Sequence, residues 1–409
     1  MSDIANEKEG ALGPDAKSSL GAAVAGLIMP FQTADAAGRQ QRRLPRAQID
    51  AMRAAGLYRV YNPARWGGFE LHMDEVLPLV AQLAEGCPAS AWVLAVYQIH
   101  TWVISLFAEQ AQTEVFGSSR DPVVCASSNP SNNRARKVPD GDVIEHGRFT
   151  FCSGAAAREW ALLGALITDD AGAVVDVGCL LVPGTELTEL DDWLVCGLQA
   201  TGSLSLVAQD LFIPAHRFLS YHAATAYRTP GAAINRGSLY QAAFVPMLVL
   251  NLAGPALGAA EFALSAFIAN LNDQGAAAGA YPLPGLPRIE APATHEVIAT
   301  ARMQIDSARL LTAQAGRTIR QAAEARRPLT PEQSAKVNLE TSYAVRECLR
   351  AVQSLFLQAG GGVLHPSHPL QGAYQDVLAI HCHGFLAHEA DLTLYGSLVT
   401  GPAQPTAFL

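Results

Sequence analysis

The chain has 409 residues, half of them hydrophobic, and a formal net charge of −9. This length exceeds what one hydrophobic core usually serves, so we expect two or three structural units. The acidic balance and the lack of a lysine- and arginine-rich cluster exclude a nucleic-acid-binding surface. The seven cysteines are scattered and include no C-x-x-C pair, which indicates free thiols in a cytoplasmic protein rather than a disulfide framework or a zinc site.

The first part of the chain predicts a helical domain behind a polar tail. Residues 1–18 are mixed in charge and lack the order of a secretory signal, so we expect a disordered tail. Residues 19–117 carry apolar positions at helical spacing. Within them, the uncharged stretch 88–107 has Gln98 and His100 near its centre and acidic flanks. These features favour a buried core helix over a membrane span.

The middle of the chain, residues 118–227, has a different period. Short β-branched or aromatic runs alternate with turn sequences such as Asp-Asp-Ala-Gly and Pro-Gly. Strands that follow one another without intervening helices predict an antiparallel sheet or barrel. Neither a Gly-x-Gly-x-x-Gly nor a Gly-x₄-Gly-Lys-Ser/Thr sequence occurs, which excludes the two common phosphate-binding loops.

The last part, residues 228–409, predicts an antiparallel helical bundle. Two long segments place small and apolar residues at alternating steps of three and four. The first stripe comprises Ile298, Ala301, Ile305, Ala308, Thr312, Ala315, Ile319 and Ala322, and the second Val337, Thr341, Ala344, Cys348, Ala351 and Leu355. Together with the apolar segment 238–269, these seams also predict a homotetramer. The fold class is therefore α+β, mostly α.

Three segments resemble motifs of one family, in the same order and with similar spacing. They are GRFTFCSGAAAREW at 147–160, DDWLVCGLQATGS at 191–203, and HPLQGAYQDVLAIHCHG at 368–384. The family is that of the acyl-CoA dehydrogenase fold, and the branch is the p-hydroxyphenylacetate hydroxylase-like oxygenase component of two-component flavin-dependent monooxygenases. The resemblance implies an N-terminal helical domain, a central antiparallel β-domain that contacts the flavin, and a C-terminal antiparallel helical bundle.

The resemblance also implies a cofactor and a partner. Reduced flavin, FMNH2 or FADH2, would react with O2 to a C4a-hydroperoxyflavin that hydroxylates an aromatic or phenolic substrate, such as a polyketide or other natural product. Because the chain has no NAD(P)H-binding fingerprint, a separate NAD(P)H-dependent flavin reductase is implied. The residues implied to contact the flavin are Phe151, Ser153, Gly154, Trp160, Thr201, Gly202 and Ser203.

Four side chains are implied to take part in catalysis: His383, Ser153, His100 and Ser128. Ser153 would hydrogen-bond near flavin N5, and His383 would lie beside the oxygen that is transferred. His100 and Ser128 would hold the hydroxyl group of the substrate, since neutral or switchable donors suit this work. His381 competes with His383, because a helix through both would point them about 160° apart. The histidines form no metal-ligand pattern, so we expect no metal.

Two other activities use the same fold. An acyl-CoA dehydrogenase needs a carboxylate base, which many relatives keep in a Tyr-Glu-Gly-Thr segment. Here the corresponding residues are Leu394, Tyr395, Gly396 and Ser397, without an acid, which disfavours that activity. N-hydroxylation of an amino sugar or another amine is the second alternative. Gln199 and Gln375 replace arginines that are common in the family, which leaves FMN and FAD both open.

Overall fold

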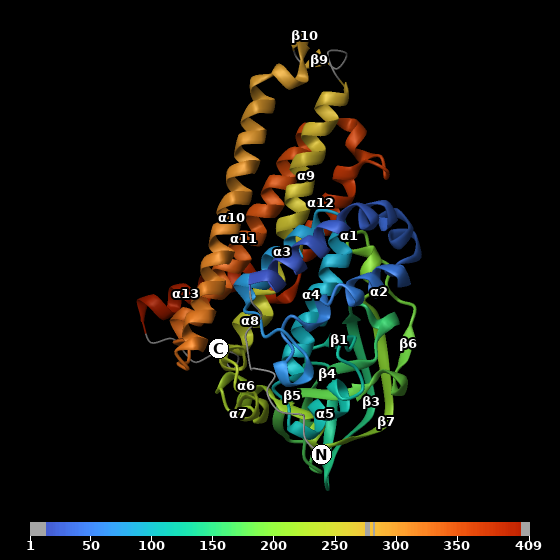
Figure 1. The fold of residues 1–409 in the computed structure, drawn as a ribbon, viewed down its shortest axis with the longest axis vertical. Coiled ribbons are helices and arrows are strands. Elements are labelled where there is room, and N and C mark those ends of the chain that lie inside the picture. The colour runs from blue at the N-terminus through green and yellow to red at the C-terminus, as the bar shows by residue number, and fades with distance from the viewer. Residues whose placement is uncertain (1–13, 275–278, 281–282, 402–409) are drawn as a thin grey trace.

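The computed structural model describes residues 14–274, 279–280 and 283–401 (Figure 1). The first thirteen residues of the predicted tail lie outside this part of the chain, and a helix already begins at Pro14. The helices before the sheet are α1 (Pro14–Gln41), α2 (Arg46–Ala54), α3 (Met73–Ala84), α4 (Pro88–Ile104) and α5 (Glu109–Phe116).

Helix α4 is the core of this first unit. Its start is defined by Pro88 at the first helical position and by Cys87, whose sulfur accepts a hydrogen bond from the amide of Ser90. All 17 of its residues are buried, which confirms the predicted core helix. Two described segments, Ser18–Gln41 and Phe244–Asn272, are long and apolar enough to cross a membrane by length and composition. The second is 89% buried inside the protein, as a core helix would be.

The β-domain is one sheet with the strand order β6-β7-β3-β2-β4-β5-β8, and β1 pairs with β4. Most pairs are antiparallel as predicted, but β1 and β2 both run parallel to β4. In the long β3–β7 pair, Cys152 lies opposite Leu204. The residues that follow β3 and precede β7 therefore meet at one end of the sheet. The strands are β1 (Val124–Ser127), β2 (Arg134–Val138), β3 (Gly141–Cys152), β4 (Trp160–Thr168), β5 (Val174–Pro183), β6 (Thr188–Leu190), β7 (Leu204–Pro214) and β8 (Phe218–Ser220).

The C-terminal part is the predicted bundle. Every residue of the first stripe except Ile298 is buried, and so is every residue of the second. The apolar segment 238–269 lies largely inside the protomer, so it is not the free face that the tetramer prediction assumed. The elements are α6 (Tyr221–Thr225), α7 (Pro230–Ile234), α8 (Phe244–Leu250), α9 (Ala253–Gln274), β9 (Gly279–Ala280), β10 (Leu283–Pro287), α10 (Pro292–Glu324), α11 (Pro331–Gln358), α12 (Pro369–His381) and α13 (His388–Thr400).

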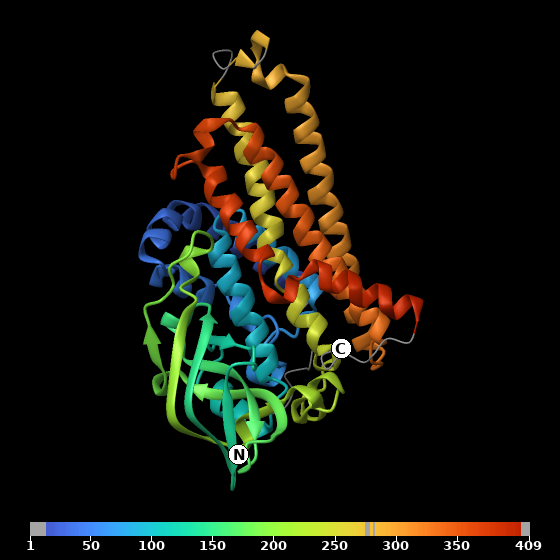
Figure 2. The same ribbon diagram turned by 180° about the vertical axis from the view of Figure 1, so that it is seen from behind.

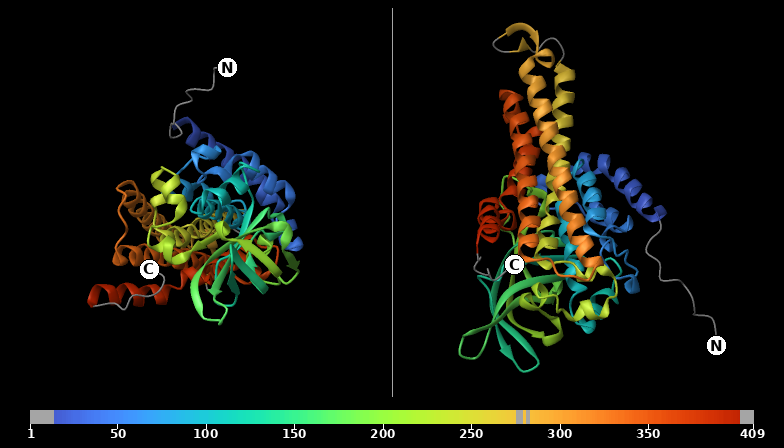
Figure 3. Two further views of the ribbon diagram at one scale, coloured as in Figure 1. Left: turned by 90° about the horizontal axis from the view of Figure 1, so that it is seen from below. Right: turned by 90° about the vertical axis from the view of Figure 1, so that its left-hand side faces the viewer.

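The three units are stacked along the long axis of the molecule. The sheet lies at one end, the bundle at the other, and α1 to α4 lie between them (Figure 1). The view from behind shows α12 running down the bundle beside α4 (Figure 2). The side view shows the α9–α10 hairpin projecting beyond the rest of the bundle (Figure 3). The junction of the three units is therefore where strand ends, α4 and α12 come together.

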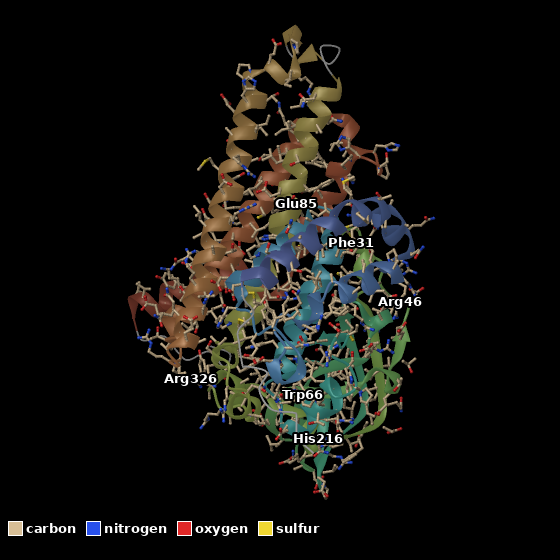
Figure 4. All side chains as sticks on the ribbon, in the orientation of Figure 1. Phe31, Arg46, Trp66, Glu85, His216 and Arg326 are labelled. Carbon is tan, nitrogen blue, oxygen red and sulfur yellow. The ribbon has the colours of Figure 1, made fainter. Side chains whose placement is uncertain are left out.

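The opposite end of the sheet has a structural ion-pair cluster. His216 lies there (Figure 4), and its Nε2 is 2.9 Å from Oε1 of Glu114. Arg217 contacts the other oxygen of the same carboxylate at 2.7 Å. This cluster ties α5 to the turn after β7. His216 is thereby accounted for by packing, away from the junction of the three units.

Candidate active site

Two turns, one after β3 and one before β7, form the centre of the site. The Cys152–Leu204 pairing brings Ser153 and Ser203 together, with 2.8 Å between their hydroxyl oxygens. Gly154 has a φ of +72°, and a Cβ there would lie 2.1 Å from the Tyr97 hydroxyl oxygen. Tyr97 donates a hydrogen bond of 2.7 Å to the carbonyl of Gly154. Only glycine fits this position, and it fixes the first turn against α4.

The hydroxyl groups of both turns form a hydrogen-bonded chain with one direction. Trp92 Nε1 donates to Ser153 Oγ at 2.9 Å, and Thr201 Oγ1 donates to the carbonyl of Leu198 at 2.8 Å. Ser203 Oγ lies 2.8 Å from Ser153 Oγ and 2.7 Å from Thr201 Oγ1. An indole N–H can only donate and a carbonyl can only accept, so every hydroxyl proton points towards Leu198. Ser153 Oγ therefore keeps a lone pair and no free proton.

His383 lies against the start of this chain. Its ring is 5.6 Å from that of Trp92 in an edge-on arrangement. Its Nδ1 accepts a hydrogen bond of 3.2 Å from the amide of Phe385, so in the neutral ring Nε2 carries the proton. Burial lowers the pKa of His383 to about 4, which keeps the ring neutral at neutral pH. The ring is thus a neutral hydrogen-bond donor.

His381 occupies different surroundings. Helix α12 ends at His381, and His383 lies beyond it as the residue that caps the next short turn. The assumption of one helix through both histidines was wrong. The charged groups that influence the pKa of His381 are Glu389 and Arg346, and burial lowers that pKa. The structure thus brings His383 rather than His381 to Trp92 and the hydroxyl chain.

His100 lies on the same face of α4 as Trp92. Its Nδ1 is 2.8 Å from the carbonyl oxygen of Val124, to which it donates, so Nε2 is an acceptor. Burial lowers the pKa of His100 to about 4. Trp92, Val96 and His100 keep 5%, 7% and 8% exposure, whereas residues 93–95 keep none. This spacing of four marks one face of the helix as less tightly covered.

The two family models that match the chain are the acyl-CoA dehydrogenase N-terminal domain, at residues 23–117, and the acyl-CoA dehydrogenase C-terminal domain, at residues 250–388. The FADH(2)-dependent resorcinol hydroxylase, oxygenase component, of Rhizobium sp. is 29% identical over 92% of this chain and 93% of its own. The flavin-dependent monooxygenase oxygenase subunit HsaA of Mycobacterium tuberculosis is 29% identical over 94% and 95%. The chain belongs to the monooxygenase branch of the acyl-CoA dehydrogenase family.

A solved structure agrees with this branch in fold. The 3-HSA hydroxylase from Rhodococcus sp. RHA1 superposes with a TM-score of 0.89, covers 95% of this chain and 98% of its own, and is 24% identical. The layout predicted for the present chain, with a helical domain, a β-domain and a bundle, is therefore confirmed.

The structure also places the other residues that the sequence predicted for the site of this monooxygenase. Phe151 has a φ of +62° and 69% exposure, and its ring lies edge-on to Trp193. Gly202 has a φ of +53° in the turn between Thr201 and Ser203. Ser128 is half-buried, directly after β1, and its carbonyl accepts from the Tyr221 hydroxyl. Trp160 lies under the guanidinium of Arg217, so its ring contact is not with the hydroxyl chain.

The sequence analysis did not identify two residues that contribute to the site of this monooxygenase, Trp92 and Asp376. Trp92 was not named as a site residue, and its hydrogen bond to Ser153 spans 61 positions. Asp376 was not named as a site residue either, yet it is fully buried and its carboxylate accepts a hydrogen bond from the Leu198 amide. A single acid among the apolar residues of α12 is the pattern that could have identified it, because a buried charge needs a partner.

Proposed function

We propose that the chain hydroxylates an aromatic or phenolic substrate with reduced flavin and O2, the flavin coming from a separate reductase. The observation that carries this proposal is the direction of the hydroxyl chain. It leaves Ser153 Oγ as an acceptor. Position N5 of a reduced flavin carries a hydrogen and donates, whereas N5 of an oxidised flavin can only accept. A site that offers an acceptor at this point suits the reduced cofactor.

The surrounding residues fit a planar ring system. Gly154 and Gly202 let Tyr97 and the main chain of Arg42 pack closely against the two turns, which holds the turns in place. Phe151 is a large aromatic residue that is 69% exposed, two positions from a buried hydroxyl, as expected of a side chain that a bound ring would cover. We propose that Phe151, Ser153, Gly154, Thr201, Gly202 and Ser203 hold the flavin. When bound, the reduced flavin supplies the electrons for oxygen transfer from O2.

The two neutral histidines would take complementary roles. His383 would donate a hydrogen bond through Nε2 near the transferred oxygen. His100 would accept the proton of a phenolic hydroxyl through Nε2, and Ser128 would assist from the end of β1. A neutral acceptor of this kind increases electron density on the aromatic carbon that is attacked. Trp92 and Val96, on the face of α4 between the turns and His100, would contact the apolar part of the substrate.

The same geometry disfavours the acyl-CoA dehydrogenase alternative, which needs a carboxylate base. The hydroxyl chain bonds to an indole, to hydroxyls and to a main-chain carbonyl. Glu389 and Asp391 lie on α13, where Ser342 influences the pKa of Asp391 and Glu389 influences that of His381. N-hydroxylation would use the same site, so amines belong in the substrate panel.

We further propose a cytoplasmic homotetramer. Large apolar side chains are exposed on the outer faces of the bundle, including Met303 at 63%, Leu310 at 69% and Leu357 at 72%. Large apolar side chains exposed in this way are typical of a surface covered by another subunit. The seven free cysteines agree with a reducing compartment. Light scattering at micromolar concentration tests the assembly, and a stable monomer would contradict it.

A coupled assay tests the function. The purified chain is mixed with a generic flavin reductase, NADH, O2 and either FMN or FAD, and a panel of phenols, polycyclic quinols and amines is offered. We expect one class of phenol or quinol to gain one oxygen atom, detected by mass spectrometry. Oxygen transfer only to amines would establish the N-hydroxylase instead. Oxidation of an acyl-CoA thioester without any oxygen transfer would overturn the proposal.

A further inference from the structure

Asp376, on α12, is a buried carboxylate that contacts the turn before β7 through the amide of Leu198. It has no exposed surface. Its Oδ1 accepts from Arg39 Nη1 at 3.1 Å and from the amide of Leu198 at 2.7 Å, and its Oδ2 accepts from Arg39 Nη2. Burial raises the pKa of Asp376, and Arg39 and the Leu198 amide oppose that shift. Three donors thus surround a carboxylate that no solvent reaches.

Leu198 is the residue through which this contact acts. It has a φ of +51°, a left-handed conformation that a residue with a side chain adopts only when its surroundings hold it there. Its amide binds Asp376, and its carbonyl accepts from both the hydroxyl and the amide of Thr201. Next to it, a Cβ at Gly197 would lie 2.1 Å from the carbonyl oxygen of Gln375. The turn is therefore fixed against α12 at the point where the hydroxyl chain ends.

Arg39 connects the same carboxylate to the other helices of the site. Its Nε donates to Asp35 at 2.6 Å, and Asp35 in turn accepts from the thiol of Cys87 at 3.2 Å. Cys87 caps α4, the helix that carries Trp92. Both ends of the hydroxyl chain, the indole donor and the carbonyl acceptor, are thus linked through Arg39 and Asp376.

We propose that Asp376 is a positioning residue that holds the Leu198 carbonyl as the acceptor end of the hydroxyl chain, and thereby sets the preference of the site for reduced flavin. Without the carboxylate, the Leu198 peptide can reorient, and the proton direction along Thr201, Ser203 and Ser153 is no longer fixed. Ser153 can then donate to the N5 of an oxidised flavin as readily as it accepts from a reduced one. This inference rests on the proposed function, because it assumes that Ser153 faces flavin N5.

The test compares Asp376→Asn with a matched control, Glu261→Gln. Glu261 on α9 is also a shielded carboxylate that binds two arginines, Arg302 and Arg309, but it lies within the bundle. Three quantities are measured for the wild type and both variants: the melting temperature, the Kd values of reduced and oxidised FMN and FAD under anaerobic conditions, and the product formed per NADH. The wild-type values come first, because a wild type that binds no reduced flavin refutes the proposed function itself.

Both variants should melt at a lower temperature, since each loses a carboxylate that binds arginine side chains, and the loss should be larger for the fully buried Asp376. Only Asp376→Asn should weaken reduced-flavin binding, by roughly 10- to 100-fold as for a lost hydrogen bond to a charged group, and reduce its preference over oxidised flavin. It should also release more H2O2 and less product per NADH. Arg39→Lys keeps the charge but loses the paired contacts. It should change the melting temperature, the flavin Kd values and the product per NADH in the same direction as Asp376→Asn, but by less. The inference is wrong if Asp376→Asn, or Arg39→Lys where Asp376→Asn does not fold, retains the wild-type flavin affinities and product yield.

Discussion

Replacement of Trp92 by phenylalanine tests the donor end of the hydroxyl chain. The indole N–H holds Ser153 Oγ in place, and phenylalanine keeps an aromatic ring without that N–H. One neutral hydrogen bond contributes about 0.5–1.5 kcal/mol, which corresponds to roughly a 2- to 12-fold change in Kd. We expect the affinity for reduced flavin to fall by a factor in this range, because Ser153 Oγ loses the bond that holds it in place.

A matched control lies on the same helix. Trp102 is fully buried, and its Nε1 donates to the carbonyl of Leu239 at 3.2 Å, away from the two turns. Trp102→Phe loses an indole hydrogen bond and the same volume, so both variants should be destabilised by a similar ~1–3 kcal/mol. Thermal melts measure this shared cost, and anaerobic titrations with reduced and oxidised flavin measure the difference. Equal flavin affinities in the two variants, or a changed preference in Trp102→Phe alone, would refute the reasoning.

Three further predictions concern the other polar side chains. Ser153→Ala should leave NADH consumption by the reductase intact while more H2O2 and less product form; unchanged product per NADH would remove Ser153 from the site. His383→Ala should slow hydroxylation by roughly 10²–10⁴-fold with little change in melting temperature, whereas His381→Ala should not, and the reverse result would exchange their assignments. Because burial lowers the pKa of His100 to about 4 from the usual 6.5, its contribution to stability is complete above pH 6.5 and is lost as pH falls towards 4, by about 3 kcal/mol. Melts between pH 7 and 4.5 should show a weaker pH dependence in His100→Gln than in the wild type.

Local sequence determined the strands and the bundle well. Within the predicted β-region 118–227, the apolar runs WALLGALIT and VVDVGCLLVP coincide with β4 and β5, because turn residues bound both. The short, charged strand β2 (Arg134–Val138) was missed, since its place in the sheet comes from backbone pairing with its neighbours. The parallel pairing of β1 with β4 depends on how the chain crosses between them, which periodicity does not encode.

The site was harder to predict because its contacts are long-range. The Ser153–Ser203 contact depends on the register of β3 against β7 across 50 positions. The distinction between His381 and His383 depends on where α12 ends, and helix ends are the least predictable feature of a helical pattern. The family resemblance selected the right segments, and the hydrogen-bond geometry then assigned donors and acceptors that no motif specifies.

In the proposed site, helix α4 carries both the residue beside the cofactor and the residue that binds the substrate hydroxyl. Trp92 and His100 are eight residues apart on one rigid, fully buried helix, which corresponds to about 12 Å along its axis. In the proposed site, the distance between the cofactor end and the hydroxyl-binding end would therefore be set by one straight helix with no internal glycine or proline. With the proposed roles of Trp92 and His100, a substrate would be selected by the distance from its hydroxyl group to its oxidised carbon, and a longer or shorter substrate would require changes in the residues that face α4. A series of phenols with one, two and three fused rings would reveal this limit as a sharp optimum in product per NADH.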